Sequence, residues 1–308
     1  MAASPLLRKA RKVVPITALA IALVTLFGCV LIAKAKGVYL SGMFWPFFSN
    51  TGRDKPAYYL FCAGLTTTAV LVAVTYGFNY QYQIAALRNA VGENTRKHQG
   101  MAMGTLAAGV LSVFGLSLLA FFDTAKYPST HSISAYWFFG WEVVATIMNT
   151  FVSKRIFELS RKSDAAFTAH YITLADTNGK PPRGERAQKC HRTFRVQLAF
   201  NLVFFVAFVI YIPWQVVFPT HCPMLSINEC VTRGYGQEYC SVTMRKNATE
   251  TILQNCEQML TKVQIRALAQ LVCILTLLGY CVTFYVHDYD DAEQDDLLEQ
   301  APPFLHPL

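Results

Sequence analysis

The chain has 308 residues, of which 53% are hydrophobic and 15% are charged, and its formal net charge is +8. Soluble domains usually carry about 25% charged residues, so this composition argues against a soluble enzyme. It also argues against a nucleic-acid-binding protein, despite the excess of basic residues.

Six stretches are long and apolar enough to cross a bilayer, which takes about 20 helical residues. They cover residues 13–33, 57–79, 102–122, 134–152, 196–218 and 264–286. They lack the polar face of a soluble helix and the alternation of a membrane barrel. We therefore expect an all-α polytopic membrane protein with one six-helix domain, residues 1–286. The first stretch exceeds the ~7–15 apolar residues of a cleavable signal, so we interpret it as a retained signal anchor.

Basic residues in short loops indicate which loops face the cytosol. With the N-terminus inside, the cytosolic segments 1–12, 80–101 and 153–195 hold 17 Lys and Arg residues. The opposite loops 34–56, 123–133 and 219–263 hold 9. This bias predicts that both termini lie in the cytosol.

A group of polar residues is expected at the lumenal ends of the second, third and fourth helices. Its members are Ser49, Asn50, Thr51, Gly52, Asp54, Asp123 and His131. They could form one site that binds a lipid headgroup or, through the histidine and two carboxylates, a metal ion. Alternatively, each is a plausible turn or cap residue. The aromatic residues near this boundary are typical of an interfacial belt.

Glu142 lies near the middle of the fourth predicted helix, where a carboxylate is costly and is a candidate functional residue. Asn149 lies seven residues later on the same helical face, and Asn201 and Gln270 are possible partners in the last two helices. Hydrogen bonding between helices, worth ~0.6–2 kcal/mol per bond, is the simpler interpretation and the one we favour.

The basic segment 153–195 is predicted to be a long cytosolic loop, with a turn-rich stretch over residues 178–184. Its ten basic residues are explained by topology alone. Attraction to anionic cytosolic lipids is the alternative explanation.

The loop 219–263 contains an even number of cysteines, Cys222, Cys230, Cys240 and Cys256. Such a cluster in one polar loop favours disulfides in an oxidising compartment, and its pairing stays open among three possibilities. Zinc binding is less favoured because no CxxC spacing is present. Asn247 begins a glycosylation sequon in the same loop, which also predicts a lumenal location.

The tail 287–308 has seven acidic residues and no Lys or Arg, a composition typical of a disordered interaction tail. Within it, Glu293 precedes Leu297 and Leu298 by four and five residues. This spacing resembles the acidic dileucine signal that clathrin adaptors bind, and a receptor-bound signal of this kind is not an anchor. It predicts endosomal or lysosomal membranes, with the plasma membrane, the Golgi or the ER as alternatives.

The sequence contains no common catalytic or nucleotide-binding motif. We therefore expect no enzyme activity, no cofactor, no metal site and no nucleic-acid partner. The oligomeric state stays open.

Three short motifs resemble the damage-regulated autophagy modulator (DRAM) family and its superfamily, which includes GPI-anchor lipid-remodelling factors. They are Pro46-Phe47-Phe48-Ser49-Asn50-Thr51-Gly52 followed by Pro56 and Phe61, His131-Ser132-Ile133-Ser134-Ala135, and Thr283-Phe284 followed by Asp288-Tyr289. Six helices with both ends in the cytosol match this superfamily. Asn50 stands where the autophagy branch has Asp, Ser132 stands where an acid commonly follows the histidine, and the two long loops have no counterpart.

The resemblance implies a non-enzymatic membrane protein that modulates autophagy, the lysosome or membrane-lipid state. Membrane lipids and a clathrin adaptor are its expected partners. One alternative is a GPI-lipid-remodelling factor of the secretory pathway, in which His131 and an acid would act as general acid and base. Another is a transporter or channel with Glu142 on the path, although no broken helices or inverted repeats support it.

Overall fold

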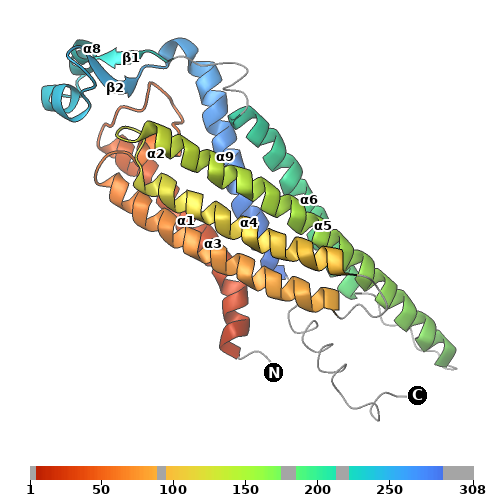
Figure 1. The fold of residues 1–308 in the computed structure, drawn as a ribbon. Helices are drawn as coiled ribbons and strands as arrows, with labels where there is room; N and C mark the ends of the chain where they lie inside the picture. The colour runs from red at the N-terminus through yellow and green to blue at the C-terminus, as the bar shows by residue number, and fades with distance from the viewer. Residues whose placement is uncertain (1–4, 89–94, 175–184, 213–221, 287–308) are drawn as a thin grey trace.

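A computed structural model describes residues 5–88, 95–174, 185–212 and 222–286. Its main body is a bundle of long helices with a small lobe at one end (Figure 1). The long helices are α1 (Pro5–Ala35), α3 (Ala57–Arg88), α4 (Arg96–Phe121), α5 (Pro128–Leu174), α6 (Glu185–Tyr211) and α9 (Leu260–Val282). We call the end of the bundle that carries the lobe the lobe end.

Short elements complete the described part of the chain. Helix α2 (Phe48–Thr51) lies between α1 and α3, and η3 (Thr283–Val286) follows α9. The lobe comprises residues 222–259, and its elements are β1 (Met224–Ser226), α8 (Ile227–Thr232), η1 (Tyr239–Thr243), β2 (Glu250–Gln254) and η2 (Glu257–Met259).

The long helices form a closed ring. Neighbours pack in the order α1, α3, α4, α5, α6 and α9, and α1 also contacts α9. Apolar residues such as Phe61, Leu65 and Leu116 form the core between them. Large apolar side chains also face outward, among them Leu31 at 69% and Val206 at 61% exposed. Such a surface would promote aggregation in water, whereas it suits contact with lipid.

Five of the helical segments meet the length and hydropathy expected of a membrane span, among the residues that the structure describes. They are Leu6–Ala35, Ala57–Arg88, Arg96–Phe121, Ala187–Tyr211 and Glu257–Tyr285. Helix α5, predicted as a sixth span, is long enough but falls outside this set. Glu142 and Asn149 lower its mean hydropathy, as do the amphipathic rings of Trp137 and Trp141.

The predicted loop 153–195 is largely helical instead. Helix α5 continues to Leu174 and α6 begins at Glu185, so only residues 175–184, which lie outside the described residues, separate them. Ten of the 22 residues in the extension 153–174 are Lys, Arg, Glu, Leu or Ala, which favour helix, and none is Gly or Pro. Arg155 and Glu158 add an ion pair at i,i+3 spacing. The prediction of a loop here was wrong because the end of the apolar run does not end the helix.

The lobe is held by two disulfides, which confirm the prediction made from the four cysteines. Cys222 pairs with Cys256, and Cys230 pairs with Cys240. Strands β1 and β2 are antiparallel, with Met224 opposite Gln254, and the sequence did not indicate this small sheet. Its core includes Leu225, Leu253 and the bonded Cys230 and Cys240, which are joined by Tyr39 from the connection after α1.

Glycines allow neighbouring helices to approach closely. A Cβ at Gly64 of α3 would overlap the side chain of Thr25 in α1. A Cβ at Gly115 of α4 would lie 2.9 Å from the backbone nitrogen of Phe138 in α5. Small residues at helix contacts are a common means of packing in membranes, where dispersion replaces the hydrophobic effect.

We expect Gly64→Ala to destabilise the bundle by about 1–3 kcal/mol, because the added methyl group overpacks the α1–α3 contact. Gly77→Ala in the same helix is the matched control, since nothing lies within 4 Å of its Cβ position and Ala is the better helix former. Thermal unfolding of the purified protein in detergent measures both. An unchanged Tm for Gly64→Ala would contradict the close packing.

Candidate functional site

The segment before α3 is irregular, and side chains of α9 form hydrogen bonds with part of its backbone. The amide nitrogens of Trp45 and Phe48 donate to the side-chain oxygens of Gln264 and Gln270, each at 3.2 Å. Gln264 also donates to the carbonyl oxygen of Trp45 at 2.8 Å. Irregular backbone at membrane depth needs such internal partners. The two glutamines thus fix the position of α2 within the ring.

Helix α2 and the start of α5 line a chamber of about 400 Å³ at the lobe end. Ser49, Asn50 and His131 contribute to its wall, so the structure brings these three predicted residues together. Arg266 of α9 and Met224 of the lobe line it from other sides. The lobe therefore borders the chamber directly.

A narrower cavity of about 70 Å³ adjoins the chamber and lies deeper in the ring. The two spaces share Ser49, His131 and Ala135 as lining residues. Apolar side chains such as Phe138 and Leu277 make up most of the cavity wall, and Glu142 is also part of it. The combined space is polar next to the lobe and apolar toward the centre of the bundle.

His131 is held by a backbone carbonyl rather than by an acid. Its Nδ1 lies 2.7 Å from the carbonyl oxygen of Phe122, which requires the proton on that nitrogen. Burial lowers the pKa of His131 from its ordinary value of 6.5, so the imidazole is neutral at pH 7. Within the described residues, no hydrogen bond or ion pair joins His131 to a carboxylate, and no group of His, Cys, Asp and Glu is arranged to hold a metal ion.

Four other residues of the predicted cluster have local structural contacts. The Asp123 carboxylate accepts from the backbone of Ala125 and Lys126 at 2.9 and 2.7 Å, which is a turn cap. The Thr51 hydroxyl donates to the carbonyl oxygen of Phe48 at 2.7 Å. Gly52 packs closely on the Phe61 ring, and Asp54 belongs to a clamp between the segment before α3 and the lobe.

The clamp joins Arg53, Asp54 and Tyr239. Arg53 forms an ion pair with Asp54 at 2.9 Å and donates to the Tyr239 hydroxyl at 3.1 Å. The Tyr239 hydroxyl donates to Asp54 at 3.0 Å, and burial raises the pKa of Tyr239, which keeps this proton in place. The clamp attaches η1 of the lobe to the segment that lines the chamber.

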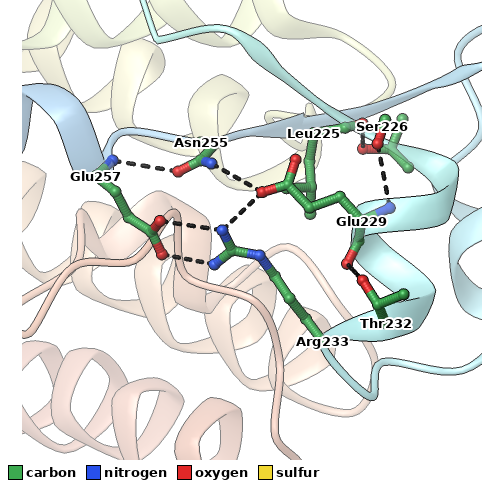
Figure 2. Close-up of polar contacts among 8 residues, drawn as sticks. Leu225, Ser226, Glu229, Thr232, Arg233, Asn255 and Glu257 are labelled. Carbon is green, nitrogen blue, oxygen red and sulfur yellow. Dashed lines mark hydrogen bonds and ion pairs between the residues drawn. The ribbon is translucent and has the colours of Figure 1, made fainter.

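A second polar network lies within the lobe and joins α8 to η2, which directly precedes α9, as Figure 2 shows. The Arg233 guanidinium contacts both carboxylate oxygens of Glu257, at 2.5 and 3.0 Å, and one of Glu229 at 2.7 Å. Asn255 donates to Glu229 at 3.2 Å and accepts from the backbone of Glu257 at the same distance. A bidentate pair of this kind fixes orientation as well as distance.

Glu142 is buried and bonded to two neighbouring helices. The Tyr76 hydroxyl of α3 donates to one carboxyl oxygen at 2.6 Å. The Ser112 hydroxyl of α4 donates to the other at 2.5 Å. The expected partners Asn201 and Gln270 make no contact with Glu142 among the hydrogen bonds of the described residues. The sequence did not identify Tyr76 and Ser112, because a Tyr or Ser within an apolar run gives no sign of the direction it faces.

Asn149 forms a second buried network about two turns further along α5 from the lobe end. It accepts from Asn79 and Gln83 at 2.6 and 2.8 Å and donates to the Tyr280 hydroxyl at 2.7 Å. Asn201 joins through Thr150, at 2.6 Å. Gln270 is separate, because it donates to the Tyr211 hydroxyl at 3.1 Å near the chamber. These hydrogen bonds join different helices, which is the structural role that the sequence favoured for the buried polar residues.

We expect Glu142→Leu to destabilise the protein by about 1–3 kcal/mol, since it leaves the Tyr76 hydroxyl buried without an acceptor. Glu142→Gln retains an acceptor and costs less. The double variant Glu142→Leu with Tyr76→Phe should recover part of the loss, because neither partner then remains unpaired. Unfolding measurements on the wild type, on Glu142→Leu, on Tyr76→Phe and on the double variant test this coupling, and strictly additive losses would disprove it.

Comparison with known proteins identifies the family of this chain. A family model described as the Frag1/DRAM/Sfk1/Cwh43P N-terminal domain matches residues 10–287. The comparisons with curated proteins and with solved structures gave no match. The family model spans all the long helices and the lobe, and it agrees with the resemblance seen in the sequence motifs. The chain therefore belongs to the Frag1/DRAM/Sfk1/Cwh43 N-terminal domain family of multi-pass membrane proteins.

Proposed function

We propose that this protein binds a membrane lipid at its lobe end and thereby modulates the lipid state of endosomal or lysosomal membranes, and with it autophagy, without catalysis. The observation that carries the proposal is the pair of adjoining spaces. A polar chamber beside an apolar cavity, with Ser49, His131 and Ala135 at the junction, matches the two ends of an amphiphile. Ligand pockets are mostly apolar with a few placed polar groups.

The proposal includes six membrane spans, with α5 as the sixth and both termini in the cytosol. Helix α5 packs between α4 and α6 in the ring. If α5 did not cross the membrane with its neighbours, the ring would be open between α4 and α6. The excess of 17 over 9 basic residues supports this orientation. The two disulfides and the exposed sequon residue Asn247 support a lumenal lobe, because disulfides persist in oxidising compartments.

The geometry of His131 favours binding over catalysis. A GPI-lipid-remodelling enzyme would need this histidine and an acid as a general acid–base pair. In the described residues the nearest fixed partner of His131 is a backbone carbonyl, and Asp123 caps a turn. The remodelling function therefore stays the alternative with less structural support.

A transporter or channel with Glu142 on its path has similarly little support. Both carboxyl oxygens of Glu142 accept from fixed hydroxyls of α3 and α4. Such saturation suits a structural carboxyl group better than one that exchanges partners during transport. If Glu142→Gln abolished a transport activity while the Tm stayed unchanged, this assignment would fail.

The proposed location depends on Glu293, Leu297 and Leu298, which lie outside the described residues. We expect Leu297→Ala with Leu298→Ala to move a tagged protein from lysosomal membranes to the cell surface, because the adaptor contact is lost. Surface biotinylation measures the shift, and Leu305→Ala in the same tail is the matched control. Undiminished lysosomal overlap of the double variant would refute the sorting signal.

Lipid binding itself can be tested at the junction of the two spaces. A lipid with a photoactivatable group in its acyl chain should crosslink to peptides that line the cavity of the full-length protein. Ala135→Trp should remove most of this labelling, because Ala135 is 7% exposed and borders both spaces. Ile133→Trp, at a site that is 66% exposed on the same helix, should leave the labelling unchanged. Labelling confined to the outer helix faces would contradict the proposed function.

A further inference from the structure

We infer that the chamber is a binding site for the headgroup of an anionic phospholipid, whose phosphate contacts Arg266 and whose acyl chain enters the adjoining cavity. The inference rests on the proposed function, because it names the lipid class that the same site would take. It depends on three observations, which are the charge of the chamber wall, its neutral hydrogen-bonding groups, and the apolar space below it.

The chamber wall is basic. Arg53, Lys246 and Arg266 line it, and in the described residues no Asp or Glu does. The Asp54 and Glu250 carboxylates that pair with Arg53 and Lys246 lie outside this lining. An anion in the chamber would therefore meet cationic groups and no facing carboxylate. Walls of one charge sign in a low-dielectric site concentrate ions of the opposite sign.

Arg266 is a buried cationic group of the chamber wall. It is 8% exposed and lies in the second turn of α9. Its Nε donates to the Tyr211 carbonyl at 3.4 Å, and its guanidinium lies 5.7 Å from the centre of the Phe47 ring. These contacts orient the planar group at the chamber wall. Guanidinium groups held in this way suit phosphate, which they can contact through two parallel hydrogen bonds.

Arg53 and Lys246 serve the chamber differently. Arg53 holds the clamp with Asp54 and Tyr239, so its replacement would also disturb the attachment of the lobe. Lys246 pairs with Glu250 at 3.5 Å and its side chain is 46% exposed, which places a flexible amine at the edge. Arg266 is therefore the residue whose replacement tests the headgroup contact.

Neutral groups beside Arg266 complete the polar half. Ser49 and Asn50 of α2 line the chamber, and within the described part of the chain their side chains make no hydrogen bond. A hydroxyl and an amide can donate to phosphate, ester or glycerol oxygens. Ser49 lies at the junction with the cavity, which suits the part of a lipid between its phosphate and its acyl chains.

The apolar cavity distinguishes a lipid from a free anion. It starts at Ser49 and His131 and continues between Phe48, Leu65 and Leu277. Its volume of about 70 Å³ exceeds several times the ~10–15 Å³ that one water needs, so it accommodates part of an acyl chain. Inorganic phosphate would gain nothing from this space. A zwitterionic lipid would bring its own cation next to the basic wall.

The test uses the full-length protein in nanodiscs of phosphatidylcholine that contain a minor share of phosphatidic acid or phosphatidylglycerol. Native mass spectrometry after release measures which lipid stays bound. We expect retention of the anionic lipid at least tenfold above its share in the bilayer, and a loss of about tenfold of that preference in Arg266→Gln. Lys262→Gln is the matched control, because Lys262 is an exposed basic residue of the same helix outside the chamber lining.

Further arms separate the possible outcomes. If Arg266→Gln fails to fold, Arg266→Lys and Asn50→Leu take its place, with smaller expected losses of preference. Lipid retained without headgroup preference would overturn the anionic site but leave the proposed lipid binding intact. No retained lipid in any disc would contradict both. Equal stabilisation by millimolar inorganic phosphate alone, lost in Arg266→Gln, would show a free-anion site and overturn the phospholipid assignment.

Discussion

Polar groups buried inside the helix ring depend on partners within the protein, because lipid offers none. The Glu142 carboxyl meets this requirement through hydroxyls on two neighbouring helices, Tyr76 and Ser112. Asn149 meets it through α3 and α9 together. Each bond is modest in membranes, yet an orphaned group costs more than a bond gains. The networks therefore specify which helix faces meet, while apolar packing supplies most of the contact area.

The same constraint shapes the lobe end. The irregular backbone at Trp45 and Phe48 is accommodated because Gln264 and Gln270 of α9 satisfy it. That arrangement positions α2, and α2 presents Ser49 and Asn50 at the chamber wall. The clamp of Asp54 with Arg53 and Tyr239 then holds the lobe beside the chamber, and the Arg233 network stabilises the lobe itself. The chamber thus results from the hydrogen bonds that the buried backbone forms with α9. Its shape depends on contacts between residues that are far apart in the sequence.

The sequence predicts the parts of this fold that depend on local composition. Apolar runs give the positions of the spans, and four clustered cysteines give the two disulfides. The stretch 134–152 in α5 is also predicted as a span, yet its hydropathy falls below that of the other five because Glu142 and Asn149 are polar. The extension of α5 to Leu174 was missed, because charged residues end an apolar run without ending a helix.

The candidate site could be predicted only in part. Ser49, Asn50 and His131 do meet at one chamber, whereas Asp54 and Asp123 serve as an ion-pair partner and a turn cap. Residue type cannot separate these roles, since a carboxylate suits a cap, a clamp and a ligand equally. Arg266 joins the site from α9, more than 200 residues after Ser49, and only the tertiary packing shows this. The most direct measurement is an experimental structure of the full-length protein in a lipid nanodisc. The account predicts elongated density from the chamber at Arg266, past Ala135, into the cavity at Glu142. Lipid density confined to the outer helix faces, with the chamber holding solvent alone, would contradict it.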